Sequence, residues 1–524
     1  MRKQRKLLIV FSVSATAALA GLLITASLMV RRFEPYIRQQ AMDYLRTGFA
    51  SEVELTSLRV SMPDLSSLGL LLTGGRGALA KVTGEGLVMR HKGRRDLPPM
   101  FVIKRFSFDV DLGTVFQTPK LVPILSLENM EIHIPPKGER PELAISGEQQ
   151  FRQITGSTVL IGVVEIKDGK LVILPKDREK KPLQFELHRV RLESAGFGVA
   201  MKYDAKLSNP RPPGEVNSQG TFGPWVREEP GNTPLAGRYV LDDADLSVFP
   251  AIAGILRSTG DFEGTLDYFN VKGQASVPDF HLRRSGNRVP LETQFEVIVD
   301  GTNGNTVLNP VVVILGNTHL KTSGGVIKNE GAIRRTINLD VSMPRGDMRD
   351  ILRLAMKGPP LMEGQIFLAA RVQVPPLDQK VREKLVVDGR FQVSRGKFLR
   401  PNIQDKIDTL SRRGQGQPQN EEIDEVFSRM NGRFRLDGQM IVFRKLTFEI
   451  PGAAVDLTGK YDLAQDALDF HGNLKLTAKV SQTMTGWKRW MLKPVDSIMA
   501  KEGAGTYIPI KVQGSSKAPK FGRD

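Results

Sequence analysis

Long runs of alternating apolar and polar residues constrain the fold of this chain most. In ALDFHGNLKLTAKV, Ala467–Val480, the residues Leu468, Phe470, Leu474 and Leu476 alternate with mostly polar neighbours. Successive side chains of a strand point to opposite faces, so this period predicts strands with one apolar and one solvated face. Such alternation is typical of antiparallel sheets and argues against a parallel sheet buried between helices. We therefore expect a mainly β fold.

The alternation slips by one residue in VFRKLTFEIPG, Val442–Gly452. Phe443 lies three residues before Leu446 and would face the opposite side of a regular strand. A β-bulge sets two residues against one on the neighbouring strand and restores the apolar face after such a slip. We predict a bulge at Arg444-Lys445. The same or a looser spacing recurs in LTSLRV (Leu55–Val60), IKRFSF (Ile103–Phe108), VPILSL (Val122–Leu127) and LHRVRL (Leu187–Leu192).

This recurrence predicts a long sheet that curves repeatedly in one sense, with chance as the alternative. Asp168-Gly169 and Asp437-Gly438 stand between apolar runs and predict hairpin turns. A short helix followed by a strand is predicted twice, in Asp245–Leu266 and in Gly346–Val372. Such helices suit caps or side elements better than a second layer of the core.

The N-terminal segment Leu7–Val30 has 24 residues without a charge. As a helix it spans about 36 Å, which is enough to cross a hydrocarbon core of about 30 Å. A cleaved signal peptide is the alternative, but the apolar run is too long for one. Basic residues at Arg2–Lys6 favour a cytoplasmic N-terminus, although Arg31 and Arg32 oppose this. Phe33–Phe49 follows as a predicted amphipathic helix, with Ile37, Ala41, Tyr44 and Leu45 forming one apolar stripe.

Composition limits the classes of function. The 524 residues carry a formal net charge of +17 and include no Cys, so disulfides and Cys-based chemistry are excluded. The positive charge is spread along the chain and accompanies no nucleic-acid-binding motif, so we expect no nucleic-acid partner.

Signals for an enzyme are weak. The six His residues, His91, His133, His188, His281, His319 and His471, are scattered singly, and His133 is expected to be solvated. HExxH, GxSxG and P-loop motifs do not occur, and GGRGALAK, Gly74–Lys81, lacks the spacing of a phosphate-binding loop. We expect neither an enzyme nor a cofactor or metal site.

Four segments carry a resemblance to a known family: VVDGRFQVSRGKF, IDTLSRRGQGQ, the stretch from MNGRFRLDGQMIVFRKLTFEIPG to ALDFHGNLKL, and GAGTYIPIKVQGSSKAPKFG. They resemble AsmA-like proteins (AsmA/TamB-type, chorein-like β-groove proteins). This similarity covers roughly residues 386–523, and VEIKDGKLVI with LQFELHRVRL resembles the N-terminal part of the family more loosely.

The resemblance implies an elongated, twisted antiparallel sheet that forms a groove, with short helices and one N-terminal transmembrane helix. It implies a single-pass inner-membrane protein of outer-membrane biogenesis, with the bulk of the chain in the periplasm. Glycerophospholipid transport along the groove is the expected mechanism, so phospholipid and the inner membrane are the expected partners. The alternative is a non-enzymatic scaffold or assembly factor for outer-membrane proteins, with envelope proteins as partners.

We expect four regions. Residues 1–32 form the cytoplasmic tip and transmembrane anchor, 33–245 a β region like the family's N-terminal part, 246–380 the middle helix-plus-strand repeats, and 381–524 the AsmA-like C-terminal β region. Polar or proline-rich segments at Pro210–Thr233 and Ser411–Glu425 predict loops or boundaries.

The apolar positions of the C-terminal strands are the candidate lipid-binding residues. A curved sheet with an uncovered apolar face would offer acyl chains a path out of water; the alternative is that this face closes as the core of a β-sandwich. The expected lining residues are Phe434, Leu436, Leu446, Phe448, Ile450, Val455, Leu457, Leu468, Phe470, Leu474 and Leu476.

The segment Thr485–Ala500 carries two of the three Trp residues. Trp487, Trp490 and Met491 share one face of a helix, beside basic residues. The segment is expected to cap the end of the last strands with its Trp side chains shielded. The alternative is a helix that docks on a membrane interface.

Overall fold

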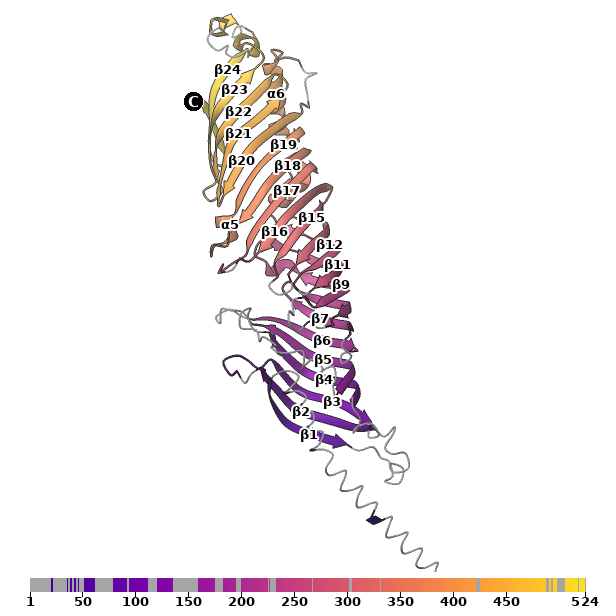
Figure 1. Cartoon of the computed structure of the whole chain (residues 1–524). Coiled ribbons are helices and arrows are strands. Elements are labelled where there is room, and N and C mark those ends of the chain that lie inside the picture. Colours follow the sequence, from indigo (N-terminus) through magenta and orange to yellow (C-terminus); the bar gives the residue numbers. More distant parts are fainter. Residues whose placement is uncertain are drawn as a thin grey trace, which may run out of the picture. The chain divides into compact units, whose positions relative to one another are not determined.

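The computed structural model is mainly β, as the alternation predicts. It describes residues 20–21, 35, 38–39, 42–43, 46, 51–61, 79–91, 94–111, 120–134, 159–174, 182–194, 199–224, 226, 232–265, 267–300, 304–329, 331–420, 425–486, 490–491, 493–496, 505–516 and 518–523. Strands make up 65% of the structure and helices 12%. Within the described residues, 23 strands belong to one antiparallel-rich sheet (Figure 1).

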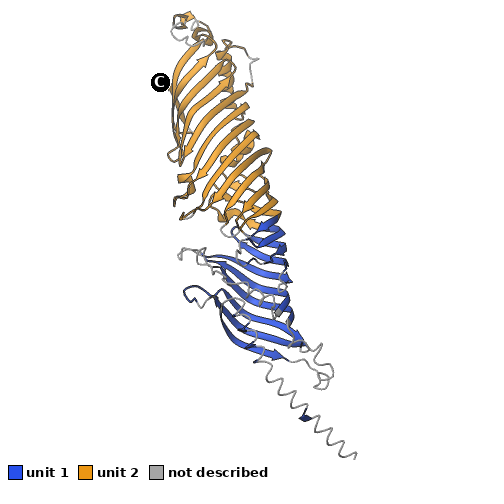
Figure 2. Cartoon of the chain, viewed as in Figure 1, with its two compact units in different colours: residues 1–242, 262–266 blue, residues 243–261, 267–524 orange. Residues whose placement is uncertain are grey.

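The chain divides into two compact units (Figure 2). The first comprises Met1–Asp242 and Phe262–Leu266, and the second Asp243–Asp261 and Asp267–Asp524. The division therefore falls inside two strands, β9 (Pro234–Asp245) and β11 (Ile255–Thr265). The boundary expected between residues 380 and 381 stays a prediction.

Eight further strands belong to the first unit. They are β1 (Ser51–Ser61), β2 (Leu79–His91), β3 (Phe101–Asp111), β4 (Lys120–Ile134), β5 (Val159–Ile173), β6 (Leu183–Glu193), β7 (Met201–Pro210) and β8 (Pro213–Phe222). Neighbours in this series pair antiparallel except β4 and β5, which run parallel. The buried core of this unit lies on one face of β1–β5 and includes Val82, Ile103, Phe106 and Ile166.

A line of irregularities crosses strands β1–β6 in the first unit. In each strand two residues three positions apart share the core face, although the register between neighbours stays constant. These pairs are Leu55/Leu58, Gly84/Leu87, Ile103/Phe106, Leu127/Met130, Ile166/Gly169 and Leu187/Val190. The register shifts only between β6 and β7, at Leu187/Arg189, where the line ends.

This arrangement corrects part of the bulge prediction. LHRVRL carries a register shift as predicted, but LTSLRV, IKRFSF and VPILSL pair with their neighbours at constant register. Opposite LTSLRV and IKRFSF, the neighbouring strands have an extra residue at the same place. Two residues therefore face two residues, and a bulge, in which two residues face one, does not form.

The hairpin predicted at Asp168-Gly169 is wrong. Both residues lie inside the 15-residue strand β5, and Asp168 has a φ of 53° on the line of irregularities. Gly86 and Asn129 take similar φ values, 66° and 52°, on neighbouring strands of that line. Asp, Asn and Gly accept this left-handed conformation in a strand irregularity as readily as in a turn. Residue type alone therefore did not distinguish the two.

The second unit continues with long strands and short helices. After β9 come η2 (Leu246–Val248), β10 (Ile252–Ala253), β12 (Phe269–Val277), β13 (His281–Leu282), β14 (Leu291–Val299), β15 (Thr306–Leu315), β16 (Thr318–Ile327), β17 (Thr336–Asp347), α4 (Met348–Ala355), β18 (Met362–Val374), α5 (Val381–Lys384), β19 (Val386–Phe398), α6 (Pro401–Gly414), β20 (Ser428–Asp437), β21 (Met440–Ile450), β22 (Ala453–Asp462), β23 (Ala467–Leu476), η3 (Val480–Thr483), η4 (Lys493–Val495), β24 (Thr506–Gly514) and β25 (Pro519–Arg523). The pairs from β12 to β25 described by register are all antiparallel.

Several local predictions are confirmed in the second unit. Asp437 pairs with Met440 across a two-residue hairpin turn, with Gly438 at a φ of 58°. Both helix-plus-strand repeats are present, as η2 with β11 and as α4 with β18. The loop predicted at Ser411–Glu425 begins only after α6 ends at Gly414.

The loop or boundary predicted at Pro210–Thr233 is wrong for Pro213–Phe222, because these residues form β8. On β8, Ser218 and Gly220 point to the same side as Val216. The alternation of apolar residues that predicts a strand is therefore missing after Val216. A Cβ at Gly220 would approach the Ala236 carbonyl oxygen to 2.0 Å, which shows how closely the next strand packs there.

Two N-terminal predictions fall mostly outside the described residues. Of the predicted span Leu7–Val30 only Ala20 and Gly21 are described, and both are helical. Among the described residues, none belongs to a helix with the length and apolar character needed to traverse a bilayer. In Phe33–Phe49 the described residues are helical, and Arg38 donates a hydrogen bond to the Leu55 carbonyl at 3.0 Å. The predicted stripe of Ile37, Ala41, Tyr44 and Leu45 lies outside the described residues.

Candidate functional site

The second unit presents one apolar sheet face and one polar sheet face. Residues directly opposite each other on paired strands point to the same side, so the register assigns every side chain to a face. We call the side that carries Phe434 the apolar face and the other the polar face. Leading from β12 to β24, the apolar face carries Val271, Val297, Val313, Leu339, Val341, Leu368, Val372, Val387, Phe391, Phe434, Phe443, Leu457, Phe470, Ile508 and Val512.

All eleven residues expected to line a lipid path lie on this apolar face. Ile450, Phe470 and Leu476 are buried, and the other eight are partly exposed. The face continues over strands β12–β19, which the expected set did not include. The signal there is the same alternation, as in Ile337, Leu339, Val341 and Met343 of β17.

Bulges on every second strand keep the apolar residues on this face. The extra residues are Pro310 in β15, Pro344 in β17, Arg395 in β19 and Arg444 in β21. At each of them the register shifts in the pairing with both neighbouring strands. The predicted bulge at Arg444-Lys445 is confirmed. Phe443 pairs with Phe434 and Leu446 with Gly432, so Phe443 and Leu446 share the apolar face although they are three residues apart.

The burial of the apolar face changes along the strands. Residues at one end are buried in two clusters, one with Met343, Ile366 and Val393 and the other with Ile450 and Leu476. Farther along the same strands Val341, Val372, Phe434 and Leu457 remain partly exposed. One end of the face is therefore covered, whereas most residues beyond it keep some contact with solvent; Val374, Phe470 and Val512 are buried there as well.

Helix α4 covers the first of these clusters and is held at both ends. Met348, Ile351 and Leu352 pack on the cluster. Asp347 caps the helix by accepting a hydrogen bond from the Arg349 backbone N–H at 2.9 Å. At the other end Asn287 donates hydrogen bonds to carbonyl oxygens of Arg353 and Met356.

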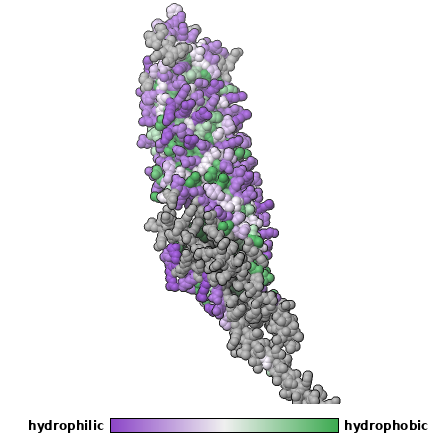
Figure 3. All heavy atoms as spheres, in the orientation of Figure 1, coloured by the Kyte–Doolittle hydropathy of each residue, from purple (hydrophilic) through white to green (hydrophobic). Residues whose placement is uncertain are grey.

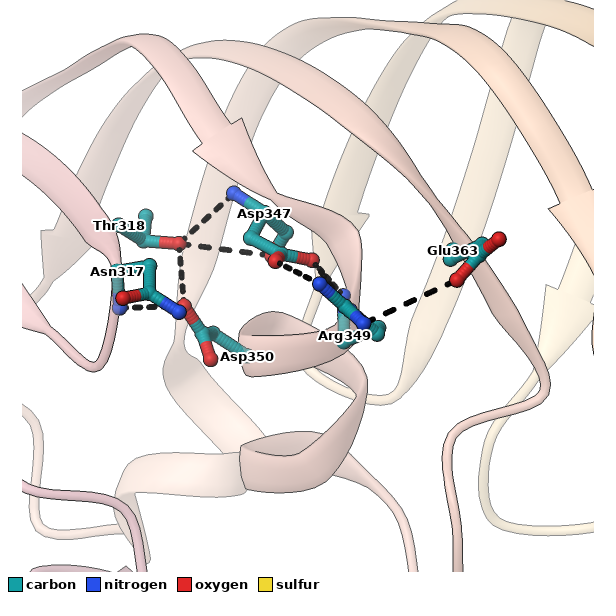
Figure 4. A network of polar contacts seen from close by, with 6 residues as sticks. All are labelled: Asn317, Thr318, Asp347, Arg349, Asp350 and Glu363. Atoms are coloured by element: carbon teal, nitrogen blue, oxygen red, sulfur yellow. Dashed lines mark hydrogen bonds and ion pairs between the residues drawn. The ribbon is translucent and has the colours of Figure 1, made fainter.

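A buried carboxylate ties α4 to the sheet (Figure 4). Asp350 is 5% exposed and accepts hydrogen bonds from the Asn317 N–H at 2.8 Å and the Thr318 hydroxyl at 3.1 Å. Arg349 forms ion pairs with Asp347 at 3.0 Å and Glu363 at 3.9 Å. Burial raises the pKa of Asp347, and the hydrogen bonds from the Arg349 side chain and backbone lower it by more, so this pKa lies below its ordinary value.

Helix α6 covers the second cluster in a similar way. Ile407 and Leu410 pack on it. Gln404 donates to Asp408 at 2.8 Å and to the Val426 carbonyl at 2.9 Å, and Asp408 accepts from the Val426 N–H at 2.9 Å. Gln404 and Asp408 are both buried, and their mutual hydrogen bonds satisfy polar groups that would otherwise be costly there.

Phenylalanine rings lie over glycines along the apolar face. The rings of Phe391, Phe434, Phe443 and Phe470 form a continuous row, with centroids 5.7 to 6.2 Å apart. A Cβ at Gly459 would approach the Phe470 ring to 2.8 Å, and one at Gly389 the Phe434 ring to 2.9 Å. The rings therefore lie against the backbone of neighbouring strands and form an apolar floor.

Polar and charged residues are prominent on the surface of the second unit. Hydrophilic residues dominate the visible surface of the second unit, with smaller groups of hydrophobic residues among them (Figure 3). On the polar face ion pairs join neighbouring strands, such as Arg371 with Asp340 at 2.9 Å and Lys475 with Asp456 at 3.4 Å.

Metal-binding residues are not gathered in the part of the chain that the structure describes. No group of three or more His, Cys, Asp or Glu residues there could hold a metal ion. The expectation of a solvated His133 is wrong, because its side chain is 14% exposed and its Nδ1 lies 2.8 Å from the Pro99 carbonyl oxygen. The Nε2 of His188 lies 2.7 Å from the Ser208 hydroxyl and 3.6 Å from a Glu215 carboxylate oxygen. In a catalytic triad the carboxylate binds the other ring nitrogen, Nδ1, so these three residues do not have the geometry of a triad.

The C-terminal Trp segment differs from the cap interpretation where it is described. Trp490 is 77% exposed and Met491 63% exposed, whereas a cap predicts shielded side chains. The Lys493 ammonium lies 5.0 Å from the Trp490 ring centroid. Trp487 lies outside the described residues.

Comparison with known proteins gives no relative: no family model, no curated protein and no solved structure matches this chain.

Proposed function

We propose that this protein is an AsmA-like, inner-membrane-anchored protein that conducts glycerophospholipid along the apolar face of its sheet. The observation that carries the proposal is the partly exposed row of apolar side chains that crosses strands β12–β24. Within the described residues this part of the face has no second sheet packed on it; the other sheet is the two-stranded pair of β10 and β13. The sequence resemblance to AsmA-like proteins supports the same function.

Acyl chains suit this surface physically. Removing an acyl chain from water gains about 0.8 kcal/mol per CH₂ group. Because the apolar residues repeat on every strand, a chain can move from one strand to the next without losing apolar contact. Polar headgroups stay in water at the uncovered margin, and no catalytic residue is required. In this proposal α4 and α6 close the opposite margin, and the sheet forms a groove.

A charge on the apolar face tests this mechanism. Leu457 is partly exposed, so Leu457→Glu should fold, and should reduce phospholipid transfer from membranes holding the full-length protein to acceptor vesicles at least tenfold. Thr458→Glu is the matched control, because Thr458 is exposed on the polar face of the same strand and should leave transfer unchanged. Circular dichroism checks the folding of both variants. Equal transfer by both, or a wild type that transfers no lipid, would favour the scaffold alternative.

The anchor and location rest on the sequence alone. With Leu7–Val30 as a single span and Arg2–Lys6 in the cytoplasm, the rest of the chain lies in the periplasm. Protease added to spheroplasts should then digest the large domain. Protection of that domain while the inner membrane is intact would reject this topology.

A further inference from the structure

A hollow of about 1270 Å³ lies on the polar face over strands β17–β21. The side chains that line it from this face include Phe367, Arg371, Arg390, Arg433, Arg444 and Lys445. The lining also includes residues of the apolar face, among them Val341, Phe391 and Phe434. The paired cations of the lining nevertheless lie on the polar face, on the other side of the sheet from the proposed lipid path.

Four cations in this hollow face each other across the strands. Arg390 pairs directly with Arg433, and Arg433 with Lys445, while Arg444 is the bulged residue beside Lys445. Neighbouring strands lie about 4.8 Å apart, so these like charges are close, which destabilises a sheet. A bulge adds a fourth charge to the same place.

The nearby acidic residues do not compensate this charge. Asp340 is paired with Arg371 at 2.9 Å, and Asp388 with Arg435 at 3.8 Å. Within the described residues, none of Arg390, Arg433, Arg444 and Lys445 has an ion-pair partner. Arg390 lies over the Phe367 ring, 5.7 Å from its centroid, which holds the guanidinium on the sheet.

We propose that this hollow binds a small soluble molecule with phosphate groups. Guanidinium groups bind phosphate oxygens through paired hydrogen bonds, and a dianionic phosphate neutralises two adjacent cations where a carboxylate neutralises one. The hollow, at about 1270 Å³, is large enough to hold a small molecule, for which sites of about 300–1,000 Å³ are usual. A lipid is less suitable, because nine of the 17 lining residues are charged or polar and five of these nine are cations.

Binding of radiolabelled inorganic pyrophosphate to the purified full-length protein tests this proposal. The wild type should bind it, and Arg433→Gln and Arg390→Gln should each weaken binding at least tenfold. Arg429→Gln is the matched control: Arg429 lies on the polar face of the same strand, pairs with Glu449 at 3.8 Å and does not line the hollow. It should leave binding unchanged.

Other outcomes would overturn the proposal. They are no binding by the wild type, equal loss in Arg429→Gln, binding only to phosphatidic acid in vesicles, or tighter binding of an acidic peptide than of pyrophosphate. The result is separable from the proposed lipid transport, because Arg433→Gln should still transfer phospholipid and Leu457→Glu should still bind pyrophosphate.

Discussion

At the residue scale, Asp347 and the glycines of the apolar face have structural roles: Asp347 caps a helix, and the glycines make room for aromatic rings. Asp245 and Asp347 both end a strand and both accept a hydrogen bond from the N–H two residues later, at the start of η2 and of α4. At Gly389 and Gly459 the lack of a side chain leaves room for a phenylalanine ring. The two aspartates therefore fix where a helix begins, and the two glycines let the phenylalanine rings lie close to the backbone of the sheet.

The cap of α4 makes a prediction about stability and pH. Asp347→Ala should destabilise α4 by about 1 kcal/mol, seen as faster amide hydrogen exchange in Met348–Ala355. Because folding lowers the pKa of Asp347, its stabilisation is complete above the ordinary aspartate pKa, about 3.9, and is lost as pH falls through the lower folded pKa. Asp347→Asn, which can still cap, should exchange more slowly than Asp347→Ala. Equal exchange in wild type and Asp347→Ala would exclude the capping role.

At the scale of elements, a bulge occurs in each of the alternate strands β15, β17, β19 and β21. Past each bulge, the side chains no longer point to the face that simple alternation from the start of the strand would give them. The two residues on either side of each bulge, three positions apart, both point to the apolar face. These flanking pairs are Leu308/Val311, Met343/Gly346, Val393/Gly396 and Phe443/Leu446. Pro310 and Pro344 fit such positions because an unpaired residue needs no N–H for the ladder.

The bulge in β21 gives a prediction that contrasts two deletions. Deleting Arg444 should leave the protein folded with little change in thermal stability, because Phe443 and Leu446 then share a face by ordinary alternation. Deleting Thr447 should destabilise the protein by several kcal/mol, since it moves Phe448 and Ile450 to the polar face. Thermal unfolding of both variants measures this. Equal melting temperatures would contradict the assigned register.

The same elements show how far sequence reasoning reaches. The bulge at Arg444 was predictable because large apolar residues flank it on both sides. At β17 and β19 the second flanking residue is Gly346 or Gly396, which gives no hydrophobic signal, so those bulges were missed. Asp168-Gly169 misled because its residues suit a turn and a left-handed strand position equally. The covering of one end of the apolar face depends on α4 and α6 packing against distant strands, which local periodicity does not encode.

At the scale of the whole molecule, the sheet of the second unit has two chemically different faces. One face offers apolar side chains on every strand from β12 to β24, and the other carries ion pairs and the cation cluster. Short helices with buried polar anchors cover the two clusters of the apolar face at one end of the strands. This arrangement has the properties that lipid conduction needs, and it requires no reaction chemistry.

Site-specific photo-crosslinking to phospholipid along β21 in intact cells tests the central claim most directly. A photoreactive residue would be placed singly at each position from Ile441 to Glu449, and lipid adducts would be identified by mass spectrometry. Adducts are expected at 441, 443, 446 and 448, and none at 442, 445, 447 and 449. Reactive positions should therefore alternate, except that two residues separate 443 from 446 at the bulge. Adducts at every position, adducts on the polar face, or no lipid adducts at all would contradict the account.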